Sequence, residues 1–148
     1  MILAFRHDIL GGMLTNETRV RVRYAETDQM GIVYYANYLV WMEIGRVELC
    51  RALGFEYREM ELQDKVLLTV AEVTCRYLSP ARYDEEVIVK TCVERAHLRL
   101  VTFGYQMRCS ADDRKLAKGT TTHIFCKPDL TPARLPEKYW GKFGITVR

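Results

Sequence analysis

Hydrophobic and polar positions change their spacing along this chain, and each change marks a boundary between predicted elements. Residues 19–24 read RVRVRY, an alternation that predicts a half-buried strand. Residues 36–53 instead carry apolar side chains at helical spacing around well over half of the helix circumference, which predicts a buried helix. Asn37 is a candidate cap near its start, and Gly54 stands where a glycine commonly ends a helix.

The rest of the chain has the character of strands at hairpin spacing. Residues 57–64 fit a short helical turn, after which runs of alternating or apolar residues are separated by turn residues. Three prolines predict an irregular tail after the last run. The four predicted strands are residues 66–78, 86–95, 98–109 and 116–127.

This order of elements predicts an α+β fold. A strand, a long helix and four more strands are satisfied by one antiparallel sheet that packs a face against the helix. Such a sheet keeps two open edges, which invite self-association. We expect a single domain over residues 15–148, with residues 1–14 as a peripheral N-terminal extension, because 148 residues suffice for one core.

Composition and charge exclude several classes of protein. The formal net charge of +3 permits an anionic ligand but does not indicate nucleic-acid binding. No run of about 18 apolar residues exists, so we expect no membrane span. The N-terminal segment is too short and too mixed in character for a secretory signal.

Five cysteines argue against both a disulfide framework and a zinc site. Their number is odd and none forms a CxxC pair. The last four recur every seventeen residues, which predicts one buried thiol per strand in a meander. Reduced thiols fit a cytoplasmic protein. The cysteines are Cys50, Cys75, Cys92, Cys109 and Cys126.

One long run carries a family resemblance. Residues 27–49, TDQMGIVYYANYLVWMEIGRVEL, resemble the signature of hotdog-fold acyl-CoA thioesterases of the 4-hydroxybenzoyl-CoA thioesterase type, and within that group the bacterial YbgC-like branch. The matching features are a T-D-x-x-G-[IV]-V-[YF]-[YH]-x-x-Y pattern and a Glu-x-x-Arg on the helix. Residues 79–87 and 126–139 agree as well, so the resemblance covers about residues 15–140.

The resemblance implies an architecture and a substrate class. In the hotdog fold a long central helix is wrapped by a curved, five- to six-stranded antiparallel sheet. The family implies homodimers whose sheets join edge to edge, with active sites at the subunit interface, and often homotetramers. It implies no metal site and no redox cofactor, since coenzyme A enters as part of the acyl-CoA substrate.

Thioester hydrolysis needs a group that drives attack on the acyl carbon and a donor for the charge that develops on the carbonyl oxygen. By resemblance Asp28 is the catalytic carboxylate, which acts as general base or as nucleophile. The resemblance likewise implies that Tyr35 provides a main-chain N–H at the helix start for the oxygen. Gly31 matches the tight turn, and Gly31, Ile32 and Asn37 are the candidate substrate-binding residues.

Purely structural roles are alternatives to these catalytic assignments. An aspartate in a loop before a helix can simply form the turn, and Asn37 can be a plain cap. Nearby tyrosines can be core or interface residues. Glu43 is a second carboxylate on the helix, which can serve the chemistry or pair with Arg46. A second such i,i+3 pair joins Glu48 and Arg51.

The sequence departs from the YbgC-like branch at Tyr35, where these proteins often carry a histidine. His7, His97 and His123 all lie outside the matched run, which argues against a histidine-assisted mechanism. Two alternatives to a thioesterase stay open, a hydratase or dehydratase on the same fold and a non-catalytic binding module for acyl-CoA or acyl carriers. The acyl group also stays open between aromatic, naphthoyl and short aliphatic groups.

Overall fold

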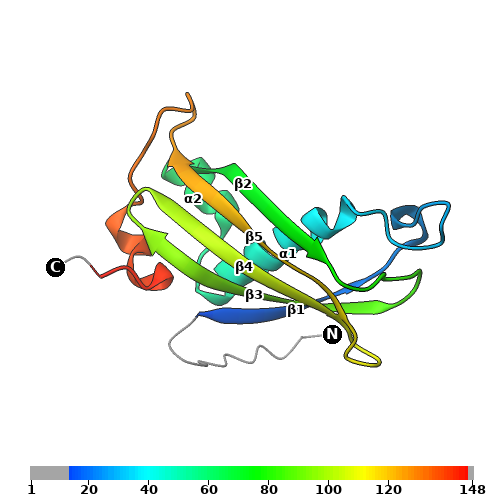
Figure 1. Cartoon of the computed structure of the whole chain (residues 1–148). Helices are drawn as coiled ribbons and strands as arrows, with labels where there is room; N and C mark the ends of the chain where they lie inside the picture. The colour runs from blue at the N-terminus through cyan, green and yellow to red at the C-terminus, as the bar shows by residue number, and fades with distance from the viewer. Residues whose placement is uncertain (1–13, 147–148) are drawn as a thin grey trace.

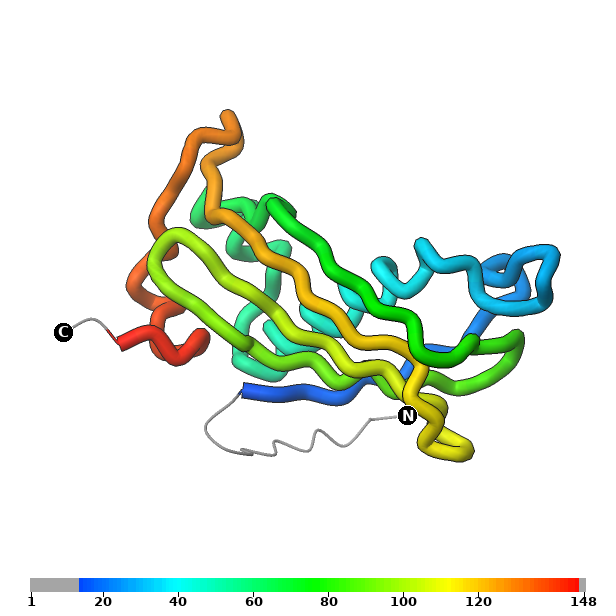
Figure 2. The backbone as a smooth tube through the Cα atoms, viewed as in Figure 1, coloured from blue at the N-terminus to red at the C-terminus, as the bar shows by residue number. Residues whose placement is uncertain are grey.

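A five-stranded antiparallel sheet lies across one long helix in the computed structural model, which describes residues 14–146 (Figures 1 and 2). The strands are arranged in the order β1-β3-β4-β5-β2, so that β1 and β2 form the two edges. Their bounds are β1 (Thr15–Arg21), β2 (Leu67–Tyr77), β3 (Glu86–His97), β4 (Leu100–Cys109) and β5 (Lys115–Cys126). The expected α+β fold is confirmed.

The long helix α1 (Asn37–Ala52) and the short helix α2 (Tyr57–Gln63) follow the predicted positions closely. The first strand differs from its prediction, because β1 begins at Thr15 and ends at Arg21. The alternation continues in sequence to Tyr24, but there the chain turns into the 3-10 helix η1 (Tyr24–Glu26). The Glu26 carboxylate accepts a hydrogen bond from the Arg23 main chain at 2.8 Å, which stabilises this turn.

The core lies between α1 and the sheet. Trp41, Met42 and Leu49 on the helix are fully buried, as are Phe103 and Phe125 on the sheet. Each such side chain stabilises the fold by roughly 1.5–3 kcal/mol relative to leaving it in water. One side of α1 therefore supplies most of the attachment between helix and sheet.

A glycine sets how closely α1 approaches β3. A Cβ atom at Gly45 would overlap the Thr91 hydroxyl and lie 3.0 Å from Cγ1 of Val89. A larger residue at this crossing therefore requires the Thr91 or Val89 side chain to shift. The close approach also leaves the buried Thr91 hydroxyl without a hydrogen-bond partner among the described residues.

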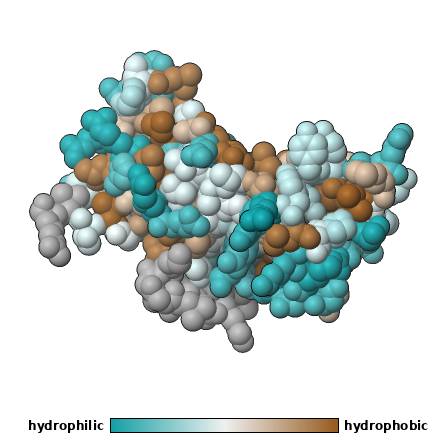
Figure 3. Space-filling view, in the orientation of Figure 1, coloured by the Kyte–Doolittle hydropathy of each residue, from teal (hydrophilic) through white to brown (hydrophobic). Residues whose placement is uncertain are grey.

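The helix is less buried than its apolar circumference predicted. Leu39 is 38% exposed and Val40 is 43% exposed, so one apolar side of α1 faces outward. The edge strand β2 likewise exposes Val70 and Val73, at 48% and 39%. In Figure 3, which shows the sheet face turned away from α1, apolar residues form patches among hydrophilic ones. The expectation of a buried helix is confirmed for the side of α1 that faces the sheet and is wrong for its outward side.

The cysteines partly follow the predicted meander. Cys75, Cys92, Cys109 and Cys126 each lie on a different strand, but only the last two are buried. Cys92 is half-buried because its neighbour Thr91 faces α1, which turns Cys92 to the opposite face of the sheet. All five thiols are free.

The predicted irregular tail folds into two short 3-10 helices, η2 (Glu137–Tyr139) and η3 (Gly141–Phe143). The rings of Tyr139 and Phe143 are buried and lie 5.0 and 5.4 Å from the ring of Phe55. This tail covers one end of the core, whereas the loop between β1 and α1 lies at the opposite end (Figure 1). None of the helices within residues 14–146 is long and apolar enough to cross a membrane.

The predicted N-terminal extension falls almost entirely outside the described residues. The strand β1 begins at Thr15, where the predicted domain begins.

Candidate active site

The loop between β1 and α1 makes a tight turn around Asp28. The Gly31 N–H donates to the Asp28 carbonyl at 3.0 Å, and the Asp28 N–H donates to the Ile32 carbonyl at 2.9 Å. Gly31 has φ +74°, a conformation that side chains disfavour, while no heavy atom lies within 4 Å of a Cβ placed there. Glycine is therefore needed for the backbone of the turn rather than for space.

One oxygen of the Asp28 carboxylate is fixed by this turn. Its Oδ1 atom accepts the Met30 main-chain N–H at 2.8 Å. Its Oδ2 atom has no hydrogen-bond partner within residues 14–146. The half-buried side chain thus offers a carboxylate oxygen beside a surface hollow.

A second acid of the same loop, Glu26, was missed from sequence. Glu26 is 4% exposed, and its carboxylate accepts hydrogen bonds from the Trp41 indole at 3.1 Å and the Arg23 N–H at 2.8 Å. Burial opposes ionisation, but these hydrogen bonds outweigh it and hold the pKa of Glu26 below its usual value. The sequence shows an acid at this position but does not show that it is buried, because the contact with Trp41 depends on how α1 packs against the loop.

The Glu26 main chain also fixes the start of α1. Its carbonyl accepts the Tyr34 N–H at 2.8 Å and the Asn37 side-chain amide at 2.9 Å. Asn37 is the first residue of α1, follows Ala36 in the cap position, and makes no capping hydrogen bond. The prediction that Asn37 caps the helix is therefore wrong, because its side-chain amide instead donates to the Glu26 carbonyl in the loop.

Two main-chain N–H groups remain unbonded where the loop enters α1. The Asn37 N–H donates to the Tyr34 carbonyl at 3.0 Å, and helical bonding begins there. The N–H groups of Tyr35 and Ala36 precede it and have no acceptor in the described part of the chain. Such groups sit at the positive end of the helix dipole, which favours a negatively charged oxygen.

A hollow of about 340 Å³ brings the loop and the end of β2 together. Its walls include three of the predicted site residues, whereas Gly31 and Asn37 are not part of the lining. The Tyr38 ring lies 5.1 Å edge-to-face from Tyr77, which makes one wall aromatic. The lining residues are Asp28, Met30, Ile32, Val33, Tyr35, Tyr38, Tyr77, Leu78, Ser79 and Pro80.

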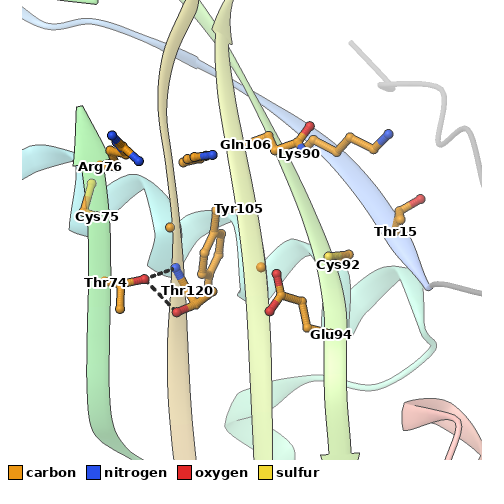
Figure 4. A pocket seen from close by; sticks show the side chains of 13 residues that line it. Thr15, Thr74, Cys75, Arg76, Lys90, Cys92, Glu94, Tyr105, Gln106 and Thr120 are labelled. Carbon is orange, nitrogen blue, oxygen red and sulfur yellow. Dashed lines mark hydrogen bonds between the residues drawn. The ribbon is translucent and has the colours of Figure 1, made fainter. Parts of the chain in front are cut away.

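A larger hollow of about 500 Å³ lies on the sheet face turned away from α1 (Figure 4). Small residues such as Cys92, Gly104 and Thr120 line it, and Lys90 and Arg76 project beside them. It contains none of the predicted catalytic residues and no helix start. The smaller hollow is the better candidate because it combines an acid with unbonded N–H donors.

Glu43, the second carboxylate considered on the helix, does not line the smaller hollow. Glu43 is exposed and forms no ion pair with Arg46, which instead lies partly buried beside Tyr57 and Tyr105. The predicted Glu43–Arg46 pair is therefore wrong, although the Glu48–Arg51 pair does form.

His123 is fully buried against Thr121 at 2.8 Å, and burial lowers its pKa to about 4. It does not line the smaller hollow.

An antiparallel sheet laid across one long helix is the architecture of the hotdog class of α+β proteins. Residues 22–141 match the family model described as the Thioesterase-like superfamily. The chain belongs to this family, and the resemblance to hotdog-fold thioesterases is confirmed.

Individual relatives agree with this assignment. The chain is 43% identical over 112 residues to YneP of Bacillus subtilis, which is named as an acyl-CoA thioesterase. The matched region covers 76% of this chain and 80% of that protein. It is 28% identical over 126 residues to the acyl-CoA thioester hydrolase YbgC of Escherichia coli, covering 84% and 92%. The solved DHNA-CoA thioesterase from Staphylococcus aureus superposes with a TM-score of 0.82 at 31% identity, over 87% of each chain.

Proposed function

We propose that the protein is an acyl-CoA thioesterase in which Asp28 drives the attack and the Tyr35 N–H receives charge from the thioester oxygen. The observation that carries this proposal is the shared hollow, where a carboxylate oxygen and an unbonded helix-start N–H lie on one lining. The names of the relatives supply the substrate class, a thioester of coenzyme A.

The reaction adds water across the C–S bond. With Asp28 as general base, Oδ2 takes a proton from water as the water oxygen bonds to the acyl carbon. The tetrahedral intermediate carries a negative oxygen, which the Tyr35 N–H stabilises. Its collapse breaks the C–S bond, and the thiolate leaves and takes up a proton.

With Asp28 as nucleophile, Oδ2 itself bonds to the acyl carbon and expels the thiolate, and water then cleaves the mixed anhydride. A single turnover in ¹⁸O-labelled water tests for an anhydride that water opens at the Asp28 carboxyl carbon. In that case the label appears in the Asp28 carboxylate and not in the product acid, whose new oxygen is then Oδ2 of Asp28. Label in the product acid alone fits either Asp28 as general base or water attack on the anhydride at the acyl carbon.

The acyl group that fits this lining best is aromatic. Tyr35, Tyr38 and Tyr77 present ring edges and faces to a hollow of about 340 Å³, and aromatic rings favour such edge-to-face neighbours. Release of free coenzyme A is to be measured over a panel of benzoyl, naphthoyl and short aliphatic thioesters. We expect higher kcat/KM for the aroyl compounds.

We further propose a homodimer that forms through the β2 edge, in the cytoplasm. The exposed apolar residues on β2 and α1 supply a surface for a second copy, and five free thiols fit a reducing compartment. The hollow is open to solvent in the single chain, and a second copy at the β2 edge would cover it beside Tyr77.

The decisive experiment replaces Asp28 by asparagine. Asp28→Asn keeps the side-chain oxygen that accepts the Met30 N–H but removes the charge, so we expect kcat to fall by about 100-fold or more with KM little changed. Asp129→Asn is a matched control, because Asp129 accepts the Thr131 N–H two residues on and follows the end of β5 that pairs with Leu67 rather than with Tyr77. A variant with wild-type kcat would refute the role of Asp28, and tight binding without thiol release by the wild type would favour a binding module.

A further inference from the structure

The phenol of Tyr77, at the end of β2, holds the peptide group at the candidate oxygen-binding site. Its hydroxyl donates a hydrogen bond to the main-chain carbonyl of Tyr35 at 2.9 Å, across a separation of 42 residues in sequence. Among the described residues no other side chain bonds to the main chain of residues 34–36. A remote strand therefore fixes the backbone where the loop becomes a helix.

The two peptide groups around Tyr35 are each held through their carbonyls. The Tyr34 carbonyl accepts the Asn37 N–H at 3.0 Å, and it shares a peptide group with the Tyr35 N–H. The Tyr35 carbonyl accepts the Tyr77 hydroxyl, and it shares a peptide group with the Ala36 N–H. Within residues 14–146 neither N–H group has an acceptor, so each carbonyl contact orients a donor that is unbonded in this part of the chain.

The helix by itself holds the Tyr35 carbonyl only weakly. The Tyr38 N–H reaches it at 3.4 Å, which is long for an N–H···O bond, whereas the Tyr77 hydroxyl lies at 2.9 Å. A hydrogen bond to a carbonyl also polarises its peptide group and strengthens the N–H as a donor. Loss of the Tyr77 hydroxyl would therefore loosen the orientation of this peptide and weaken its donor.

The Tyr77 ring is itself fixed in place. It lies edge-to-face to Tyr38 at 5.1 Å and to Tyr35 at 6.5 Å, with an interplanar angle of 86° in both pairs. Partial desolvation of the hydroxyl, on a ring that is 44% exposed, together with the neighbouring Cys75 thiol raises the pKa of Tyr77. The phenol accordingly stays protonated at neutral pH and remains a hydrogen-bond donor.

We propose that Tyr77 is a positioning residue for thioester hydrolysis: its hydroxyl orients the Tyr35–Ala36 peptide group and thereby the Ala36 N–H, a second donor beside the Tyr35 N–H for the developing oxyanion. This inference rests on the proposed thioesterase function. Prearranged donors act mainly in the transition state, where the charge on the oxygen is largest. The contribution of Tyr77 therefore belongs to kcat rather than to KM.

The test is Tyr77→Phe, which removes the hydroxyl and keeps the ring. We expect kcat to fall by about tenfold or more with KM within about twofold of wild type, as for loss of one supporting hydrogen bond. The matched control is Tyr83→Phe, because Tyr83 is also an exposed tyrosine with an edge-to-face partner, Tyr24, but does not line the hollow. The control keeps wild-type kcat and KM.

A second readout separates positioning from a general loss of structure. In ¹⁵N-labelled protein the amide resonances of Tyr35 and Ala36 shift in Tyr77→Phe, while those in the tail after β5 do not. Wild-type kcat in Tyr77→Phe, or a raised KM at unchanged kcat, overturns the proposal. Absence of thiol release by both wild type and Tyr83→Phe overturns the thioesterase function and with it the catalytic part of this inference, while the amide shifts still decide whether Tyr77 orients the peptide.

Discussion

Two carboxylates stand two residues apart in the loop, and their surroundings give them opposite tasks. Glu26 is buried and receives hydrogen bonds from Trp41 and Arg23, so it joins the loop to α1. Asp28 keeps one oxygen, beside the hollow, that has no partner in the part of the chain that the structure describes. The sequence motif predicted the position of Asp28, but the burial of Glu26 follows from tertiary packing that no local pattern contains.

At the same scale, His123 makes stability depend on pH. Its folded pKa of about 4 lies below the usual 6.5, so the folded state prefers the neutral ring and the unfolded chain takes up the proton first. This stability is complete above pH 6.5 and is lost as the pH falls toward 4. The full effect is on the order of 3 kcal/mol.

Chemical denaturation of wild type and His123→Gln across that pH range measures this contribution. We expect the wild type to lose stability more steeply on acidification than the variant. His97→Gln, at the end of β3, is the control because His97 is exposed, and it should follow the wild type. Parallel curves for wild type and His123→Gln would contradict the prediction.

At the scale of elements, the periodicity of apolar residues predicted where helices and strands lie but not how the strands pair. The bounds of α1 and of the last three strands came within about two residues, because long alternating or helical runs report which side faces the core. The start of β1 was missed because the TNET segment lacks an apolar alternation. The strand order was also inaccessible, since pairing of β1 with β3 depends on contacts distant in sequence.

The crossing of α1 over β3 offers a test at this scale. Alanine favours helices by about 1 kcal/mol over glycine, yet we expect Gly45→Ala to destabilise the protein because its Cβ meets the Thr91 hydroxyl. Thr91→Ala removes that hydroxyl, which is buried without a partner among the described residues. The double variant should regain much of the loss.

A thermodynamic cycle of the four proteins measures the coupling through urea unfolding. A coupling energy of about 1 kcal/mol or more is expected for two residues in direct contact. Additive effects would mean that the helix moves away from β3 at little cost.

At the scale of the whole molecule, the β2 edge and the outward side of α1 form an exposed apolar surface that a second copy of the chain can cover. Unpaired edge strands with apolar side chains promote association, and natural monomers usually protect them with charge. Here Val70 and Val73 lie on the edge strand β2, whose last residue is Tyr77. The oligomer and the active site are therefore expected to depend on one surface.

Val73→Glu places a charge on this edge. We expect a dimer in the wild type, a monomer in the variant, and a loss of thioesterase activity that accompanies dissociation, all measured by light scattering with parallel assays. Leu62→Glu makes a comparable change at an exposed apolar residue of α2 and should leave both properties intact. A monomeric wild type that is fully active would refute the shared surface.

The strand order also has a consequence for how the chain reaches its native state. Strands β3, β4 and β5 are joined by short hairpins and can pair early, whereas β1 and β2 must close loops of many residues before they pair at the two edges. Asp28, Tyr35 and Tyr77 all belong to these late-joining parts. Substitutions in the central hairpins are thus expected to slow folding, and those around the hollow to accelerate unfolding, so the site should be the first region to open when the native protein fluctuates.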